Sequence, residues 1–152
     1  MAFTGNFISS KTAYNTLQII EITNLSYPVL LLDKAFVGEG MAYGIKMFSA
    51  NENYWQGHFA GNSVVPGTTM LEVMSQLFSV LILHGKGNKG ERCVGYDKTR
   101  FYKEVKPGDK FEMFAEIVSD RMNIITGLLN GYVGDTLVCS TNITKVIFDK
   151  EK

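Results

Sequence analysis

Thr68-Thr-Met-Leu-Glu72-Val-Met-Ser75-Gln76-Leu-Phe-Ser79-Val-Leu-Ile-Leu-His84 is the stretch that decides the fold, because it runs on without a glycine or a proline. A strand of that length would be unusual, so we predict a helix roughly 26 Å long between Gly67 and Gly85. Its apolar residues point almost all round the axis, which is typical of a buried helix. The only polar stripe is formed by Glu72, Ser75, Gln76 and Ser79.

The rest of the chain is rich in β-prone stretches. We expect strands at residues 29–37, 41–48, 93–102, 111–118, 123–133 and 137–148. Turns are predicted at residues 106–109 and 134–135, and a short helix near residues 11–20. About six strands and one long buried helix indicate an α+β fold in which a strongly curved antiparallel sheet wraps the helix.

The composition indicates one globular domain over residues 1–152. The 15 basic and 15 acidic side chains give a formal net charge of zero, which argues against general nucleic-acid binding. No apolar run approaches the roughly 20 residues of a membrane span, and the N-terminus does not resemble a signal peptide. We therefore expect a cytoplasmic protein without membrane contact. We also expect Cys93 and Cys139 to be reduced thiols inside the packed domain.

Candidate chemistry is concentrated where a loop leads into the helix. His58 lies among small residues, where an imidazole can face a ligand. Pro66-Gly67 leads into the helix N-terminus, whose free N–H groups and positive dipole end favour an oxyanion or a carbonyl oxygen. Glu72 follows about one turn into an apolar helix, where burial favours the protonated acid. A neutral histidine, a protonated acid and an oxyanion donor are the groups that proton abstraction beside a carbonyl requires.

Simpler interpretations of these residues stay open at this point. Thr69 and Glu72 have the spacing of a capping box, in which Glu72 would only cap the helix. A lone loop histidine is more often structural or solvated than catalytic. His58, Glu72 and His84 lack the close spacing of metal ligands, so we predict no metal site.

The string His58-Phe-x-Gly61-x-x-Val64-x-Pro66-Gly67, followed by Glu72 and Gln76, resembles the 3-hydroxyacyl-[acyl carrier protein] dehydratases of the FabZ type. The resemblance runs from about residue 24 to 148. It includes Tyr27-Pro28-Val-Leu-Leu-Leu-Asp33, Asp97-Lys-Thr-Arg-Phe101 and Val105-Lys-Pro107-Gly108-Asp109. It implies a hotdog fold and dehydration of a 3-hydroxyacyl thioester to the trans-2-enoyl thioester without a cofactor.

The resemblance also implies roles for individual residues. His58 would take the α-proton, Glu72 would protonate the departing hydroxyl directly or through water, and the Gly67 N–H would hold the thioester carbonyl. The division of labour between His58 and Glu72 stays open in the sequence. The other candidates would support the site (Gln76, which would orient Glu72, and Phe59, Gly61 and Pro66) or line the acyl tunnel (Met70, Met74 and Phe78).

The implied assembly is a homodimer whose two sheets join edge to edge, often with three such dimers together. In that assembly His58 of one protomer faces Glu72 of the other. Ala60 and Ser63 stand where the family usually has prolines, and Ser75 where alanine is common, so we expect a divergent member with a less rigid loop. An acyl thioesterase of the same fold and a non-catalytic acyl-binding paralogue are the alternative functions.

Charge is not spread evenly along the chain. Residues 86–106 hold seven Lys or Arg and three Asp or Glu, a net charge of +4, so the remaining residues sum to −4. A solvated face explains this excess as well as a docking surface for an acidic acyl carrier protein does. The docking candidates are Lys98, Arg100, Lys103 and Lys106.

Overall fold

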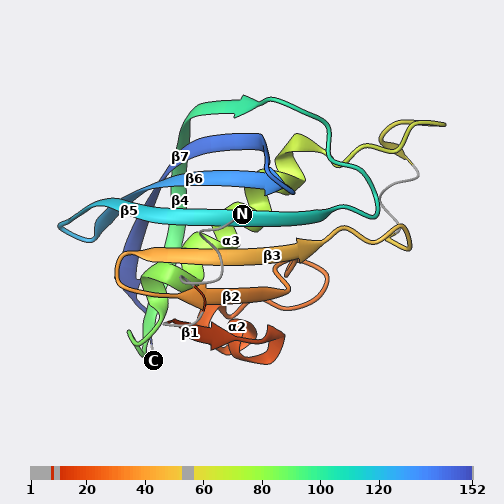
Figure 1. The fold of residues 1–152 in the computed structure, drawn as a ribbon. Coiled ribbons are helices and arrows are strands. Elements are labelled where there is room, and N and C mark those ends of the chain that lie inside the picture. Colours follow the sequence, from red (N-terminus) through yellow and green to blue (C-terminus); the bar gives the residue numbers. More distant parts are fainter. Residues whose placement is uncertain (1–7, 9–10, 53–56, 152) are drawn as a thin grey trace.

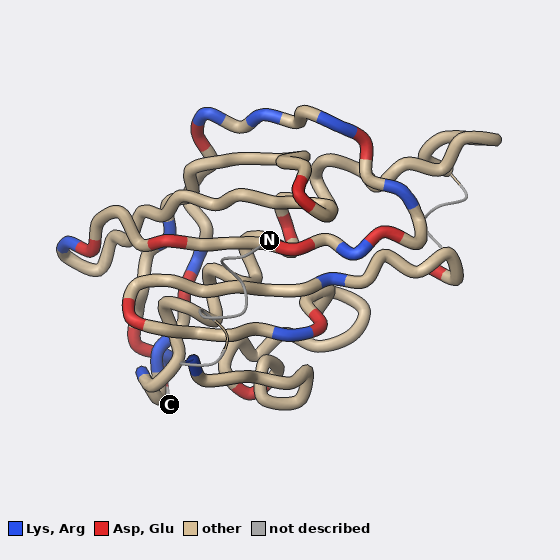
Figure 2. Tube along the Cα trace, in the orientation of Figure 1, with Lys and Arg blue, Asp and Glu red and all other residues tan. Residues whose placement is uncertain are grey.

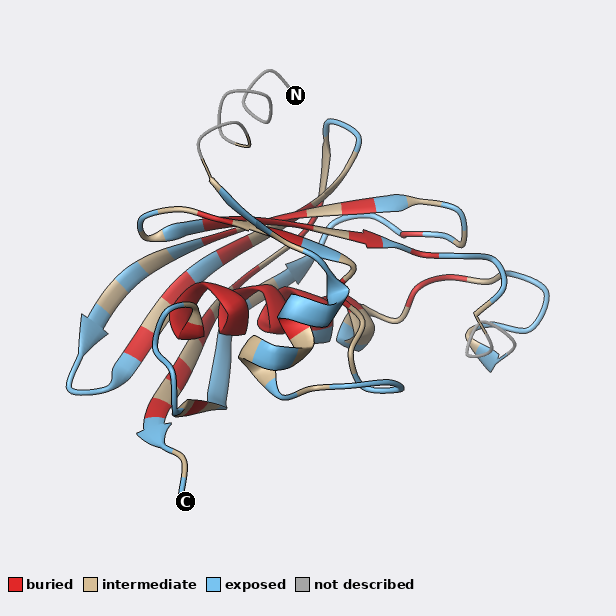
Figure 3. Cartoon of the chain, turned by 90° about the horizontal axis from the view of Figure 1, so that it is seen from below, coloured by how far each residue is buried: buried red, intermediate tan, exposed pale blue. Residues whose placement is uncertain are grey.

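The long helix α3 (Gly67–Leu83) lies at the centre of the fold. The computed structural model describes residue 8, residues 11–52 and residues 57–151. α3 begins and ends one residue before the predicted bounds, and residues 73–83 are buried without interruption. Figure 3 shows α3 buried under the curved sheet, with the more exposed α2 (Thr16–Thr23) beside it. The predicted buried helix is therefore confirmed.

A single antiparallel sheet wraps α3 (Figure 1). Within the described residues it has seven strands, in the order β1-β2-β3-β5-β6-β7-β4. They are β1 (Thr12–Tyr14), β2 (Lys34–Val37), β3 (Met41–Met47), β4 (Lys89–Phe101), β5 (Lys110–Arg121), β6 (Ile124–Val133) and β7 (Thr136–Asp149). The expected hotdog arrangement is confirmed, with seven strands instead of about six. The pattern did not predict β1, because three residues are too few to show an alternation.

Two segments before α3 differ from their predicted structure. The apolar run 29–37 forms a strand only from Lys34 onward. The N–H groups of Leu31 and Leu32 donate to a side chain of α3, so they are not available for pairing with another strand. The short helix expected near residues 11–20 is α2, which starts later because Asn15 forms a capping box at its N-terminus.

The two predicted turns are confirmed. At residues 106–109, the Asp109 N–H donates to the Lys106 carbonyl at 3.0 Å, and Gly108 adopts a left-handed φ of 99°. Gly134, with a φ of 58°, lies in the turn that joins β6 to β7. Glycine adopts this region of φ without the steric cost that a Cβ would bring.

Glycines of the sheet let large side chains of α3 touch the strand backbone. A Cβ on Gly127 of β6 would lie 2.3 Å from the ring of Phe78, which is fully buried. A Cβ on Gly44 of β3 would lie 2.9 Å from the side chain of Leu77. Both distances are well below the normal separation of two carbon atoms. The close packing of α3 against the sheet therefore depends on the missing side chains at these positions.

The two cysteines lie in different environments. Cys139 of β7 is fully buried, as expected, and burial raises the pKa of its thiol to about 12. Cys93 of β4 is exposed, so the expectation that it lies inside the packed domain is wrong for the single chain. The reason is the position of β4 at the edge of the sheet, where residues 92–98 are all exposed.

Replacing Gly127 by alanine should destabilise the fold, because the new methyl group would collide with the Phe78 ring. We expect the free energy of unfolding in urea to fall by about 1–3 kcal/mol, the usual cost of overpacking a core. Gly57→Ala is the control, since none of the described residues comes within 4 Å of a Cβ at that position. A Gly127→Ala protein as stable as the wild type would contradict this packing of α3 on β6.

Candidate active site

Two hydrogen bonds to Val64, farther along the same loop, hold His58 in place. Its Nδ1 lies 2.9 Å from the carbonyl oxygen of Val64, and the Val64 N–H donates to the His58 carbonyl at 2.8 Å. Because a carbonyl oxygen only accepts, Nδ1 must carry the hydrogen. In the neutral ring, Nε2 therefore has the free lone pair and can accept a proton. The structure thus fixes the tautomer that a general base at Nε2 requires.

The loop beside His58 closes on itself through its backbone. The N–H of Phe59 donates to the Asn62 carbonyl, and the N–H of Asn62 donates to the Phe59 carbonyl, both at 3.0 Å. Gly61 sits between them with a φ of 78°, a conformation that favours glycine. The Phe59 ring stacks on the imidazole of His58, with ring centroids 4.0 Å apart. Phe59 and Gly61, both predicted supporting residues, therefore shape the loop that carries His58.

Pro66 and Gly67 form the start of α3. The Pro66 carbonyl accepts from Thr69 and Met70, at 3.0 and 3.2 Å, so the first helical turn is closed. As the first residue of the helix, Gly67 has an N–H with no partner inside the helix, and this N–H lies at the positive end of the dipole. This is the backbone geometry that stabilises a carbonyl oxygen as it gains negative charge.

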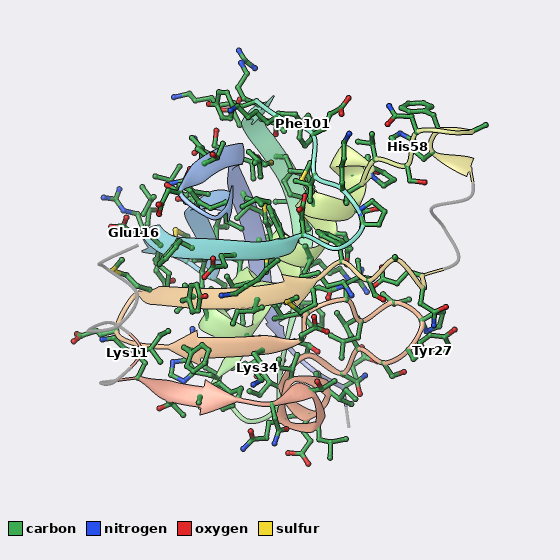
Figure 4. The ribbon with its side chains drawn as sticks, turned by 45° about the vertical axis from the view of Figure 1, so that its right-hand side comes forward. Lys11, Tyr27, Lys34, His58, Phe101 and Glu116 are labelled. Atoms are coloured by element: carbon green, nitrogen blue, oxygen red, sulfur yellow. The ribbon has the colours of Figure 1, made fainter. Side chains whose placement is uncertain are left out.

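An aromatic ring lies against Gly67, and a side chain at this position would have to displace it. A Cβ there would lie 2.7 Å from the ring of Phe101, at the end of β4. Figure 4 shows Phe101 and His58 at the same end of the molecule. Phe101 was not among the predicted site residues, although it belongs to the quoted motif Asp97-Lys-Thr-Arg-Phe101, which was the available signal.

The structure excludes the capping box suggested by the spacing of Thr69 and Glu72. The residue that caps α3 is Pro66, no side chain forms a cap hydrogen bond, and the first turn holds no acidic residue. Thr69 lies inside the first turn, because α3 already begins at Gly67. Glu72 therefore has no role in starting the helix.

Gln76 has its whole amide group engaged. Its Oε1 accepts from the N–H groups of Leu31 and Leu32, at 2.8 and 3.1 Å. Its Nε2 donates to the Val29 carbonyl at 2.8 Å and to Glu72 Oε1 at 2.9 Å. Because the two backbone N–H groups fix which end of the amide is the oxygen, the NH₂ group must face Glu72. Gln76 is buried, so its amide is held in the position from which it donates to Glu72.

Glu72 is exposed in the single chain. Its own protomer therefore does not supply the burial that was expected to favour the protonated acid. The residue nevertheless lies on a helix whose next turns are buried, with a carboxyl oxygen oriented by Gln76. A group that covers Glu72 would have to come from outside the described part of this chain.

A pocket of about 610 Å³ brings several predicted residues together. It is lined by His58, Val64, Val65, Pro66, Gly67, Thr68, Met70, Phe101, Tyr102, Lys103 and Glu104. The histidine and the helix N-terminus thus share one cavity, while Glu72 is not part of its lining. Of the tunnel candidates, Met70 lines this pocket, whereas Met74 and Phe78 are fully buried in the core.

The docking candidates lie on the end of β4 and in the following loop. Figure 2 shows the Lys and Arg of this segment along one edge of the molecule, interrupted by acidic residues. All four candidates are exposed, and Lys103 also lines the pocket. The ammonium of Lys106 lies 3.8 Å from the carboxylate of Glu104, an exposed ion pair. The segment is therefore accessible and adjoins the candidate site.

Two further observations concern metals and membranes. In the described part of the chain, no three His, Cys, Asp or Glu side chains are grouped so that they could hold a metal ion. None of the helices among these residues has the length and apolar character that a bilayer crossing requires.

Gln76→Leu should lower stability, because it leaves two backbone N–H groups and one carbonyl without their partner. We expect a loss of at least about 2 kcal/mol in the free energy of unfolding, since each unpaired buried polar group costs about 1–3 kcal/mol. Glu72→Gln is the matched variant, because its amide oxygen still accepts from Gln76. It should unfold within about 0.5 kcal/mol of the wild type. Equal destabilisation by both would refute the role given to Gln76.

Comparison with known proteins identifies relatives along most of the chain. The FabA-like domain family matches residues 28–142. A 3-hydroxyacyl-[acyl-carrier-protein] dehydratase FabZ from Alkaliphilus metalliredigens is 37% identical over 134 residues, 86% of this chain and 91% of that protein. A FabZ of the same description from Bacillus cereus is 38% identical over 142 residues, 91% of this chain and 99% of that protein.

Solved structures share the fold at low sequence identity. The dehydratase heterocomplex ApeI:P from Xenorhabdus doucetiae aligns with a TM-score of 0.74 at 13% identity, over 88% of this chain and 91% of that one. An uncharacterised protein from Pyrococcus horikoshii aligns with a TM-score of 0.68 at 18% identity, over 86% and 93% of the two chains. With the family match and the sequence relatives, these findings lead to one conclusion: the chain belongs to the FabA-like family and is a relative of the FabZ dehydratases.

Proposed function

We propose that this chain dehydrates a 3-hydroxyacyl-[acyl carrier protein] thioester to the trans-2-enoyl thioester, in fatty-acid or related acyl-chain biosynthesis. The observation that carries the proposal is the hydrogen bond between His58 Nδ1 and the Val64 carbonyl, because it leaves Nε2 free to take a proton. The identity of 37–38% to FabZ dehydratases, over most of the chain, supports the substrate class.

The proposed reaction needs only proton transfers, so no cofactor takes part. His58 Nε2 removes a proton from C2, and the electron pair moves toward the thioester carbonyl, whose oxygen accepts from the Gly67 N–H. The pair then forms the C2–C3 double bond as the C3–O bond breaks. Glu72 gives its proton to the departing hydroxyl, which leaves as water. Return of the proton from His58 to Glu72 through solvent completes the cycle.

In this proposal Glu72 comes from a second copy of the chain. The pocket that holds His58 and Gly67 does not include Glu72 of the same protomer, and that carboxyl is exposed. A partner lying over it would remove it from water and favour the protonated acid that the last step needs. Both observations support a site shared between two protomers.

The edge strand β4 is the surface where we place the partner. It is 13 residues long and lies at the end of the sheet, with Val94, Tyr96 and Phe101 exposed. A long edge with exposed apolar side chains tends to pair with another strand. A second β4 would give a symmetric dimer with one continuous sheet, and three such dimers would give the larger assembly implied by the family resemblance.

Alanine at His58, or glutamine at Glu72, should lower kcat/KM for a carrier-linked 3-hydroxybutyryl thioester by about 10²–10⁴-fold, the usual contribution of a general acid or base. Enoyl formation followed at 260 nm is the measurement. His84→Ala is the control, because His84 lies at the other end of α3 and contacts Tyr14. If both variants stay active, the proposed roles are wrong. Thiol release without enoyl formation would indicate a thioesterase, and binding without turnover a non-catalytic paralogue.

Mixing the two inactive variants tests whether the site is shared. In a mixed dimer, one of the two sites would combine an intact His58 with an intact Glu72. If subunits exchange at random, half of the dimers are mixed, so about a quarter of the wild-type activity should return. A mixture that stays inactive under conditions of confirmed subunit exchange would place both residues of each site in one protomer.

The basic segment at the end of β4 is proposed to receive the carrier protein. Its residues are exposed, and Lys103 lies on the pocket that holds His58. Positive charge beside this pocket would steer an acidic carrier protein toward it.

Lys98→Glu combined with Arg100→Glu should raise KM for the carrier-linked substrate by about tenfold and leave KM for a small thioester unchanged. We expect the change for the carrier-linked substrate alone, because the carrier protein would contact these residues and a small thioester would not. Lys34→Glu is the control, since Lys34 is exposed on β2, away from β4 in the strand order. Equal changes for both substrates would show that the two residues act on the site itself.

A further inference from the structure

Thr68, the second residue of α3, lines the pocket that also holds His58 and Gly67, and the proposed mechanism does not use it. The residue is exposed in the single chain. In a helix every Cα–Cβ bond is tilted toward the N-terminus, so long side chains and hydroxyls alike lean that way. The Thr68 side chain is therefore directed toward the end of α3 at which the Gly67 N–H is offered.

The Thr68 hydroxyl lacks the acceptor that a helical hydroxyl commonly uses. Thr23 of α2 shows the common arrangement, since its hydroxyl donates to the Ile19 carbonyl, four residues earlier, at 2.8 Å. Four residues before Thr68 the chain is not yet helical, and the Val64 carbonyl there accepts from His58 Nδ1. In the part of the chain that the structure describes, the Thr68 hydroxyl has no hydrogen-bond partner. It is therefore available to a bound molecule.

The thioester oxygen has a single donor in the proposed mechanism, the N–H of Gly67. A carbonyl oxygen has two lone pairs, and water hydrogen-bonds to both of them outside the site. The oxygen gains negative charge as the proton leaves C2, and hydrogen bonds to a charged oxygen are the stronger ones. One N–H alone would replace only part of what water provides. A second donor in the same pocket is therefore expected.

The lining of the pocket contains four side chains that can donate a hydrogen bond, namely those of His58, Thr68, Tyr102 and Lys103. His58 Nδ1 and the Tyr102 hydroxyl already have partners, at 2.9 and 3.0 Å. Lys103 is exposed on the loop that follows β4. Thr68 directly follows Gly67, so their Cα atoms are about 3.8 Å apart. Of the four, Thr68 is the donor that the chain itself holds beside the Gly67 N–H.

We infer that the Thr68 hydroxyl is a further catalytic group, which donates to the thioester oxygen beside the Gly67 N–H while that oxygen carries negative charge. The inference rests on the proposed function. The bond to the neutral carbonyl of the substrate is weak, and it strengthens as charge develops. Thr68 therefore stabilises the transition state more than the bound substrate, which raises kcat and has little effect on KM.

Thr68→Val tests the hydroxyl directly, because valine has nearly the same shape and keeps the backbone N–H. We expect kcat for a carrier-linked 3-hydroxybutyryl thioester to fall by about 10–100-fold, the range for one hydrogen bond to a charged group. KM should stay within about twofold of the wild-type value. Thr68→Ser, which keeps the hydroxyl, should retain most of the wild-type kcat. A Thr68→Val enzyme with wild-type kcat, or with a raised KM alone, would overturn the inference.

Thr69→Val is the matched control for the start of the helix. Thr69 is the next residue in the first turn of α3, and the described lining of the pocket does not include it. The exchange of a hydroxyl for a methyl group is the same, so any general effect on the helix N-terminus should be shared. We expect kcat and KM to stay at their wild-type values. An equal loss of kcat in Thr69→Val and Thr68→Val would refute the role of the hydroxyl.

The wild-type enzyme separates the two levels of this proposal. If it forms no enoyl thioester, the proposed dehydration fails, and the role of Thr68 fails with it. If the wild type and Thr68→Val form the enoyl thioester at equal rates, the dehydration stands and only the assignment of the hydroxyl is wrong.

Discussion

One buried side chain, Gln76, connects the fold of this protein to its candidate chemistry. The helix that carries it is enclosed by the sheet, so every polar group on it needs a partner inside the protein. Gln76 meets that need with four hydrogen bonds, three of them to the backbone of residues 29–32. The fourth reaches Glu72. The contact that holds the loop against the core is therefore also the one that directs the proposed catalytic acid.

The same helix presents different chemistry along its length. Its N-terminus, at Gly67, opens to the pocket that contains His58 and offers an unpaired N–H. One turn later, Glu72 stands at the exposed side, and beyond it Ser75 and Ser79 contact the buried ion pair of Lys145 and Glu91. In the proposed dimer, a reacting thioester would thus meet a donor for its carbonyl on the helix of one protomer and an acid for its hydroxyl on the helix of the other.

Local sequence patterns predicted α3 well, because a long stretch without glycine or proline forms this helix. They failed at residues 29–33, because an apolar run does not show that a distant glutamine will take its backbone N–H groups. The capping-box spacing was equally misleading, because Pro66 and Gly67 begin the helix earlier. Within the site, His58, Gly67 and Gln76 were predictable from the family motif. Lys145 and Glu91 were not, since 54 positions separate them and only the pairing of β4 with β7 brings them together.

Stability alone does not account for this ion pair. Two apolar side chains of similar volume are often as stabilising as a buried pair of charges, or more so. Here the pair also leaves Glu91 Oε2 without a donor from any residue that the structure describes. Residues that break a local rule of stability without compensation in the fold are expected at functional sites. Because Ser75 and Ser79, which contact the pair, lie on the same face of α3 as Glu72, the pair fixes the position of the helical face that carries the proposed catalytic acid.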